Sequence, residues 1–562
     1  MKKRSQWFIV LVLALSLIAV AQPPSVKIQD EVQSYCKDLP FNMSVPAIPT
    51  FPDRDFNITK FGALGDGLHS NTEAFRRAIE ECSKAGGGRV VVPSGMWLTG
   101  PITMRSNVNL HLETGALIQF SGNFDEYPLV DATYEGQPQL RCTSPLNGNR
   151  LENIAVTGEG VIDGAGEAWR PVKKFKMTAT EWKELVAFGG VVDPSGSTWW
   201  PSEQAMNGES NLRKLRESGK TPGKKELEVV RDYLRPVMVS FVECRNVLLD
   251  GPTFQNSPAW NIHPLLCENV VVRNITVRNP WYSQNGDGID LESCRNVVLY
   301  RSNFDVGDDA ICLKSGRDEF GRKRGRATEN VVIADCVVYH GHGGFTIGSE
   351  MSGGVRNIKV VNCLFIGTDV GLRFKSTRGR GGVVENIHIS DVVMKHIPTS
   401  AIDFNLYYGG KAPTEDESAE DKSSAAKEVP VTEQTPRFRD IYLKNISCTG
   451  ARDAVILQGL PEMPLSNISL DHVTMTATKG ISMFDAKDVK ITNSRVLVSS
   501  GPAILLNQTS KLSVVGFEYG RGLLMRLAGN KTKDIEIKNT KLDGERSIEF
   551  GRGVSKDAVR IK

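Results

Sequence analysis

Beyond about residue 245, the chain repeats one short pattern of polar and apolar positions. An asparagine or aspartate is followed by an aliphatic residue, any residue and a second aliphatic residue, and a turn then ends the phrase. Apolar and polar residues alternate within each phrase, which predicts short strands separated by turns rich in Asn, Gly and Ser. The phrase begins at Asn246, Asn269, Asn296, Asn330, Asn357, Asn386, Asp440, Asn467, Asp488 and Asp534.

The spacing of the phrases predicts the fold class. Several intervals span 21 to 34 residues, and most contain no long helical pattern. Units of this length with strands alone bury their inward face by coiling, each coil about 4.8 Å from the last. We therefore predict an all-β fold, a right-handed single-stranded parallel β-helix. A leucine-rich repeat would need a leucine framework, and a propeller would need four antiparallel strands in each unit.

The open edge of the first coil needs a cover, because unpaired strand edges invite aggregation. Residues 70–84 read SNTEAFRRAIEECSK, and Ser70 with Glu73 fits a capping box. We expect an amphipathic N-terminal capping helix here. Its apolar residues recur at helical spacing, at Phe75, Ala78, Ile79 and Cys82.

Two stretches interrupt the repeat. Residues 164–234 carry mixed charge, tryptophans and helix-like segments, which indicates an excursion from one coil. Residues 411–435 are polar and low in aromatic residues, which predicts a mobile surface loop. The predicted organisation is a signal peptide over residues 1–21, an N-terminal extension over 22–50 and a parallel β-helix domain over 51–562.

The first residues have the features of a secretory signal peptide. Three basic residues precede an apolar run from Trp7 to Ala21, which ends in the small-residue pattern Ala-Val-Ala. The run is short for a membrane span, and no second run of this kind follows. We expect export to the periplasm, the cell surface or the medium, with no membrane span after cleavage.

Charge and cysteine content restrict the expected partners. The 562-residue chain has a formal net charge of +3, and loss of three basic residues with the signal leaves 65 basic against 65 acidic residues. Net charge therefore gives no reason to expect a nucleic-acid partner. The ten cysteines show no CxxC spacing and many occupy strand positions, so we expect buried free thiols. No cofactor motif is present, and a monomer is expected.

Charged residues gather at one part of four successive repeats. Residues about one repeat apart stack in a β-helix, so we expect these side chains on one wall. Crowded carboxylates suit glycoside cleavage, because repulsion raises the pKa of one group and leaves its neighbours ionised. Residues 314–326 add six basic and two acidic residues near this wall, and a calcium site is an alternative use for the acids. The gathered residues are Asp287, Asp308, Asp309, His342, Glu350, Arg373 and Lys375.

The same residues lie in four blocks that resemble those of the polygalacturonase-type, pectin-degrading family 28 of glycoside hydrolases. The blocks of that family are Asn-Thr-Asp, Gly/Gln-Asp-Asp, Gly-His-Gly and Arg-Ile-Lys, in this order on a right-handed parallel β-helix. The segments FGALGDGLHSNTEAFRRAIEEC and NSPAWNIHP are also similar to the family. In this chain the blocks are Asn285-Gly286-Asp287, Gly307-Asp308-Asp309, Gly341-His342-Gly343 and Arg373-Phe374-Lys375.

The resemblance implies a role for each acid. Asp308 corresponds to the general acid, and Asp287 and Asp309 to the carboxylates that activate water with inversion. His342 corresponds to the residue that supports the protonation state of the acid. The height of one coil, about 4.8 Å, lies nearer the separation of a retaining pair than that of an inverting pair, so inversion is implied by the resemblance alone.

The resemblance also implies the substrate, a pectic polysaccharide or oligogalacturonide, and we expect no metal or cofactor. Arg373 and Lys375 correspond to the binders of the substrate carboxylate. Gly348-Ser349-Glu350 is similar to exo-acting members, so we expect Glu350 to help recognise a chain end and residues 164–234 to close one end of the groove. A rhamnogalacturonan or branched-pectin hydrolase, a pectate lyase and a non-catalytic carbohydrate-binding β-helix are the alternatives.

Overall fold

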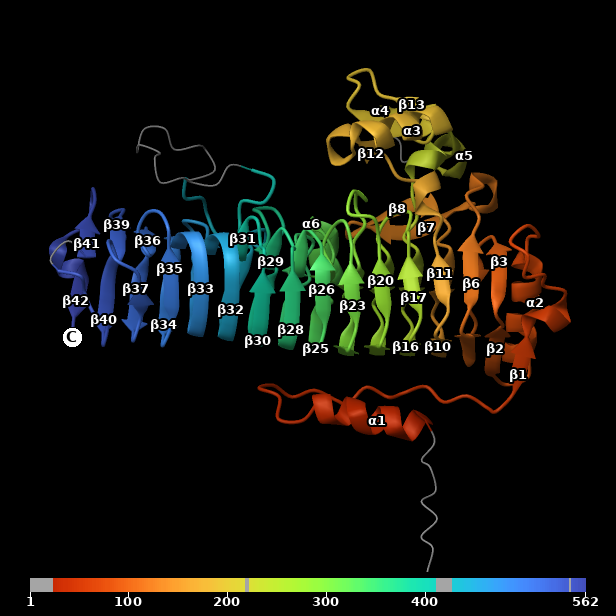
Figure 1. Ribbon diagram of the computed structural model, residues 1–562, viewed down its shortest axis with the longest axis horizontal. Helices are drawn as coiled ribbons and strands as arrows, with labels where there is room; N and C mark the ends of the chain where they lie inside the picture. Colours follow the sequence, from red (N-terminus) through yellow and green to blue (C-terminus); the bar gives the residue numbers. More distant parts are fainter. Residues whose placement is uncertain (1–23, 218–221, 411–426, 545–546) are drawn as a thin grey trace, which may run out of the picture.

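A long solenoid of parallel strands forms the body of the molecule (Figure 1). The structure is a computed structural model that describes residues 24–217, 222–410, 427–544 and 547–562. The predicted right-handed parallel β-helix is confirmed. The predicted signal peptide and most of the predicted loop 411–435 lie outside the described residues.

Each central coil contributes three short strands, and each strand pairs in parallel with its counterpart one coil away. The first strand is the apolar run of the repeated phrase, and the third carries the residues of the predicted site. One coil holds β19 (Glu268–Arg273), β20 (Thr276–Arg278) and β21 (Ile289–Glu292), and the next holds β22 (Arg295–Tyr300), β23 (Asn303–Asp305) and β24 (Ile311–Lys314).

The asparagines of the repeated phrase turn the chain at each coil. Their φ angles lie between +53° and +57° from Asn246 to Asn386, a left-handed conformation that asparagine tolerates better than most residues. Each side-chain amide donates to the amide oxygen of its counterpart one coil earlier, as in Asn269 to Asn246 at 3.0 Å and Asn330 to Asn296 at 3.1 Å. The polar start of the phrase therefore has both a conformational and a hydrogen-bonding cause.

Stacked side chains fill the inside of the coils. Ile311 and Leu313 are fully buried, and the rings of Phe374 and Phe404 stack with centroids 4.0 Å apart. All ten cysteines are free and nine of them are buried, so the prediction of buried free thiols is confirmed for those nine. The thiol of Cys267, for example, contacts the carbonyl oxygen of Phe241 on the preceding coil at 3.2 Å.

Helix α2 (Thr72–Lys84) covers the N-terminal end of the solenoid, as predicted (Figure 1). Its buried face includes all four predicted apolar residues. The predicted capping box is wrong. Asn71 is the N-cap and makes no side-chain cap bond, the Ser70 hydroxyl lies 3.1 Å from that of Thr72, and Glu73 instead pairs with Arg76.

The segment before the solenoid lies along its outer surface, on the side away from the excursion (Figure 1). Val32 of helix α1 (Pro24–Tyr35) packs against outward apolar residues of successive coils, including Val271 and Val298. The Tyr35 hydroxyl donates to Asp335 at 2.5 Å. Outward apolar residues of the strands are covered in this way.

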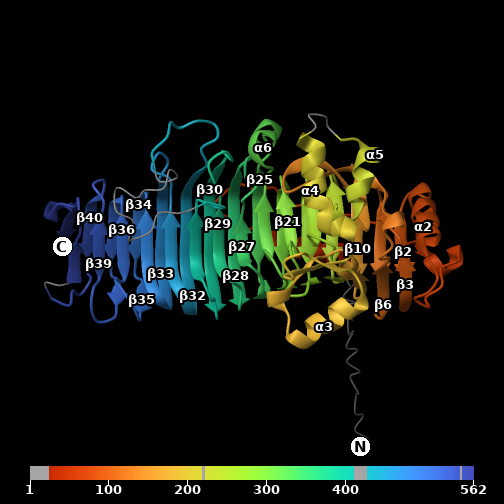
Figure 2. The ribbon, with the colours of Figure 1, turned by 90° about the horizontal axis from the view of Figure 1, so that it is seen from above.

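The excursion forms a small helical unit over one face of the solenoid (Figures 1 and 2). It contains α3 (Ala179–Phe188), α4 (Glu203–Glu217), α5 (Lys224–Leu227) and the antiparallel strands β12 (Val172–Lys173), β13 (Val191–Val192) and β14 (Thr198–Trp200). A hairpin of β7 (Leu129–Tyr134) and β8 (Gln137–Cys142), which the sequence analysis did not predict, packs against it. Among the described helices, none combines the length and apolarity that crossing a membrane requires.

Candidate active site

The outer face of one sheet brings the predicted site residues together. Strands β21 and β24 continue in parallel register into β27 (Gly343–Ile347), β29 (Val370–Lys375) and β31 (Ser400–Asn405). Side chains alternate between the two faces of a strand, so residues in register with Arg373 share its outward direction. This outward row is Asp290, Cys312, Thr346, Arg373 and Asp403.

Three carboxylates meet where the turns enter these strands. One oxygen from each of Asp287, Asp308 and Asp309 lies within 4.8 Å of the other two, and we call these residues the acid triad. Asp287 and Asp309 are buried, whereas Asp308 is half-buried. The backbone fixes the turns against each other, because the Gly288 amide donates to the Asp309 carbonyl at 2.9 Å. Asp308 is therefore the member of the triad most open to a substrate.

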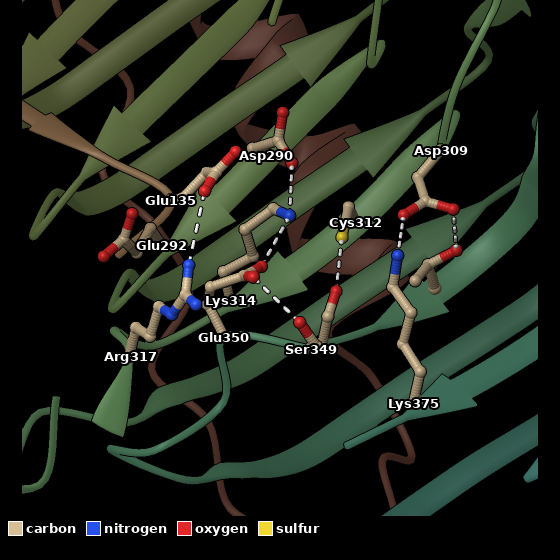
Figure 3. Close-up of polar contacts among 12 residues, drawn as sticks. Glu135, Asp290, Glu292, Asp309, Cys312, Lys314, Arg317, Ser349, Glu350 and Lys375 are labelled. Carbon is tan, nitrogen blue, oxygen red and sulfur yellow. Dashed lines mark hydrogen bonds and ion pairs between the residues drawn. The ribbon is translucent and has the colours of Figure 1, made fainter. Parts of the chain in front are cut away.

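Asp309 is held as a carboxylate by two buried cations. Lys375 Nζ lies 2.6 Å from Asp309 Oδ2, and Arg373 Nη1 lies 3.1 Å from Oδ1 (Figure 3 shows Lys375). The Thr346 hydroxyl donates to Oδ1 at 3.0 Å. Burial raises the pKa of Asp309, but the combined attraction of Lys375, Arg373 and Lys314 outweighs it and holds the pKa well below its usual range. Asp309 is thus held in its ionised form.

Asp287 has the opposite electrostatic environment. Burial, followed by repulsion from Asp290 and Asp308, raises the pKa of Asp287 well above its usual range. Its Oδ1 atom has no hydrogen-bond partner among the described residues. Within the triad, burial and then crowding raise the pKa of Asp287, whereas the resemblance implies Asp308 as the proton donor.

His342 contacts the triad through its backbone. Its amide donates to the Asp308 carbonyl at 2.9 Å, which fixes the turn that carries Asp308. Its half-exposed ring contacts a carboxylate outside the triad, with Nδ1 2.7 Å from Asp369 Oδ2. This contact is the main cause of the lowered pKa of Asp369. Among the described residues, no side-chain contact joins His342 to the triad, so the predicted support of Asp308 would act through the shared turn.

Glu350 is part of a buried charge cluster next to the triad (Figure 3). Its carboxylate lies 3.1 Å from Lys314 Nζ and accepts a hydrogen bond from the Ser349 hydroxyl at 2.8 Å. Burial raises the pKa of Glu350, but Lys314 and Lys375 lower it overall to about 2. Lys314 also lies 3.5 Å from Asp290 and 4.4 Å from the centre of the Trp260 ring. Any recognition by Glu350 therefore involves the ammonium of Lys314.

Most partners in this cluster were not among the residues predicted from the sequence. His263 Nε2 lies 2.9 Å from Glu292, whose other oxygen pairs with Arg324. One signal could have found these residues: His263, Glu292 and Lys314 occupy alternate positions of short strands whose other positions are aliphatic. Polar residues at outward positions of a buried sheet rarely serve packing.

The basic segment 314–326 is not the free positive patch that its composition predicted. Several of its cations have a carboxylate partner among the described residues, so local attraction for an acidic substrate is smaller than expected. The pairs join Lys314 to Glu350, Arg317 to Glu135, Arg322 to Glu433, Lys323 to Glu319 and Arg324 to Glu292.

The β7–β8 hairpin crosses the outward row on its N-terminal side. At the hairpin turn, the Gly136 carbonyl accepts a hydrogen bond from the Arg317 amide at 3.0 Å, and Glu135 pairs with the Arg317 side chain at 3.3 Å (Figure 3). The Tyr134 ring lies against Trp260 with centroids 5.0 Å apart. A pocket of about 210 Å³ remains between the hairpin and the sheet. The hairpin therefore covers the outward row on the N-terminal side of the acid triad.

The excursion supports this bridge. Leu129 and Cys142 of the hairpin share a buried apolar cluster with Trp169 and Leu234 of the excursion. Arg235, which follows the excursion, donates to Asn285 Oδ1 at 3.1 Å, next to the acid triad. The hairpin closes this side of the row, and the predicted excursion packs against the hairpin and supports it.

A parallel β-helix with clustered carboxylates at one wall defines a class of carbohydrate-cleaving enzymes. Residues 171–500 match the model of glycosyl hydrolases family 28, and the chain belongs to this family of glycoside hydrolases. The solved exopolygalacturonase of Thermotoga maritima is 32% identical, with a TM-score of 0.65, covering 88% of this chain and 96% of that one.

Curated relatives agree with this family. The chain is 28% identical to a probable polygalacturonase of Vitis vinifera, over 75% of this chain and 74% of the relative. It is also 28% identical to an exo-poly-alpha-D-galacturonosidase of Dickeya chrysanthemi, over 82% of this chain and 74% of the relative.

Proposed function

We propose that this chain hydrolyses α-linked galacturonic acid in pectin and releases residues from a chain end. The observation that carries the proposal is the division of charge within the acid triad. Asp309 is ionised beside Arg373 and Lys375, while Asp287 has a raised pKa. Glycoside hydrolysis needs one ionised carboxylate and one acid that still holds its proton, and the opposite pKa shifts of Asp309 and Asp287 support a site that can supply both.

In the proposed mechanism, Asp308 protonates the leaving oxygen, because it is the most open member of the triad. Asp309 activates water, and Asp287 completes the water site from the neighbouring coil. His342 supports Asp308 through the turn they share. We infer inversion from the family resemblance. Proton NMR of early product should then show the β-anomer before mutarotation, and an α-anomer would mean retention.

Substrate carboxylate binding is assigned to Arg373 and Lys375, which keep donors beyond those used on Asp309. Tyr408 lies beside both cations, with its ring centre 5.0 Å from Lys375 Nζ. Because these cations already pair with Asp309, the triad is a poor calcium site. The assay below therefore includes a chelator, and loss of activity in chelator would overturn this reading.

Exo action is supported by the hairpin that bridges the row before the triad. A polymer cannot pass under the contact between Gly136 and Arg317, so only a chain end fits there. Replacing residues 131–140 with a short Gly-Ser linker should open this side and allow internal cleavage. If the variant still releases only end products, the hairpin is not the determinant.

The first test of the function follows purified protein on polygalacturonate in chelator. New reducing ends, unsaturated product and product sizes are recorded together, with Asp308→Asn as the control. Monomer from the first time points without unsaturation, lost in the variant, is the expected result. Unsaturated product would mean a lyase, and inactivity on this polymer would favour a branched or rhamnose-containing pectin.

The acid assignment has its own test, because a good leaving group needs no proton. Asp308→Asn should lose much less activity on an aryl α-galacturonide than on digalacturonate. Asp287→Asn should lose activity on both. The reverse pattern would transfer the role of acid to Asp287, in line with its raised pKa.

We also propose that the protein is exported to the periplasm, the cell surface or the medium and acts there as a monomer. The basic start, the apolar run to Ala21 and the Ala-Val-Ala end support this proposal. A mature protein that begins near Gln22, detected by mass spectrometry, is the expected result. An intact N-terminus in the purified protein would contradict it, and sedimentation would test the monomer.

A further inference from the structure

The outward row continues beyond the triad toward the C-terminus, and its chemistry changes there. Because the hairpin closes the N-terminal side, the rest of a bound polymer must lie over the later strands. The next outward positions in register with Arg373 and Lys375 are on β31, β32 (Arg437–Gln458) and β33 (Leu465–Phe484). They hold Asp403, Asn405, Ile456, Gln458, Ser482 and Phe484.

Asp403 is the only charged residue among these six positions. It lies in register with Arg373 one coil away, and Asn405 lies in register with Lys375. Asp403 is half-buried. Among the described residues, no hydrogen bond or ion pair engages its carboxylate. An unpaired, half-buried carboxylate on a substrate-facing row has no evident structural purpose.

The charged groups around Asp403 do not neutralise it. Arg373, on the preceding coil, forms its ion pair with Asp309 instead. Arg452, on the following coil, pairs with Asp453 at 2.7 Å. Burial, against the attraction of Arg373 and with repulsion from Asp453, raises the pKa of Asp403 to about 6. Its charge is therefore fully developed only above that pH.

Resting on the proposed function, we propose that Asp403 determines specificity for the second sugar on the leaving side of the cleaved bond. The first sugar on that side meets Arg373 and Lys375, which favour a carboxylate. The second sugar meets Asp403 and uncharged residues, which disfavour a carboxylate. The enzyme thus prefers a sugar without a negative charge at this position, such as a methyl-esterified uronate or a neutral sugar.

Three trimers test the proposal at pH 7.5, where Asp403 is ionised. Trigalacturonate carries a free carboxylate on its last sugar, the second trimer carries a methyl ester there, and the third carries galactose. The measured quantity is the ratio of kcat/KM between each neutral trimer and trigalacturonate. One unscreened like charge at a partly buried site corresponds to roughly a tenfold preference in the wild type.

Asp403→Asn should reduce this ratio to about two or less, and Asp403→Glu should keep it, because only the charge matters. Asp557→Asn, which removes an exposed carboxylate near the C-terminus, is the matched control and should keep the tenfold ratio. Cleavage of digalacturonate by the wild type tests the proposed function separately, because the dimer does not reach Asp403. If the dimer is cleaved and the wild type treats all trimers alike, or Asp403→Asn retains the preference, the inference about Asp403 is overturned.

Discussion

Replacing Lys375 with glutamine separates two roles that the site geometry allows for this lysine. Lys375 Nζ is 2.6 Å from Asp309 and both side chains are buried, so the lysine stabilises the ionised form of the base. An opposite charge at this range lowers a carboxyl pKa by about 1–3 units. The variant should therefore raise the pKa of Asp309 by about that amount. Arg373, at 3.1 Å, remains and still lowers this pKa in part.

The assay is kcat/KM on digalacturonate from pH 3.5 to pH 8. The acid limb of the wild type lies below this range, and Lys375→Gln should bring it toward the acid end of the range, so that the loss of activity is greater at pH 4 than at pH 7. Lys490→Gln, at an exposed lysine of β34 (Ala486–Thr492), should match the wild type. An unchanged acid limb with a raised KM would refute the reasoning, because Lys375 would then act only on the substrate.

Stability should depend on pH in the same variant. The pKa of Asp309 is lower in the folded state than in the unfolded state, where it is near 4. Its ion pairs therefore stabilise the fold fully above the pKa of the unfolded state. This contribution is lost as the pH falls through the pKa of the folded state. Urea unfolding of Lys375→Gln should show a loss of about 2–4 kcal/mol at pH 7 and a smaller one at pH 3. An equal loss at both values would contradict this linkage.

Three substitutions test the scaffold by chemical denaturation. Asn330→Ala should cost about 1–3 kcal/mol, because it removes two ladder hydrogen bonds and places alanine at a φ of +57°; a neutral effect would refute the ladder. Phe374→Ala should cost about 3–5 kcal/mol through the cavity beside Phe404, and a loss below 1 kcal/mol would mean that the coils collapse into it. Tyr35→Phe should cost about 1–2 kcal/mol through its bond to Asp335, and no change would mean that α1 is held by apolar contacts alone.

The repeated phrase predicted the solenoid because each part of it has a local physical cause. Asparagine supplies the left-handed turn, and the alternating aliphatic residues supply the inward face. The hairpin was missed because its turn is Glu135-Gly136, and Glu-Gly is not among the dipeptides that usually signal such a turn. Glu135 and Gly136 have φ angles of +48° and +70°, the pattern of a two-residue hairpin turn between alternating strands. A single hairpin inside a repeat leaves no periodic signal.

The candidate residues were found from stacking by repeat length, but their contacts depend on more than spacing. The family resemblance assigns Arg373 and Lys375 to a substrate carboxylate, and in the structure both pair with Asp309. Asp309 lies 64 residues before Arg373 in the chain. Only the register of three successive strands brings these groups together. This register cannot be predicted from the sequence, because the coils differ in length.

The charge balance of the cluster explains which acids have a raised pKa. Asp309 has two cations within 3.1 Å, and Glu350 has Lys314 at the same distance. Asp290 shares that lysine at 3.5 Å, and burial raises its pKa to about 7. Asp287 has no ion pair among the described residues and lies between other carboxylates, so a proton is the least costly way to bury it. The acid triad thus obtains its mixture of ionised and protonated groups from where the cations lie, one coil at a time, and moving a cation by one coil would change which carboxylate can give up a proton.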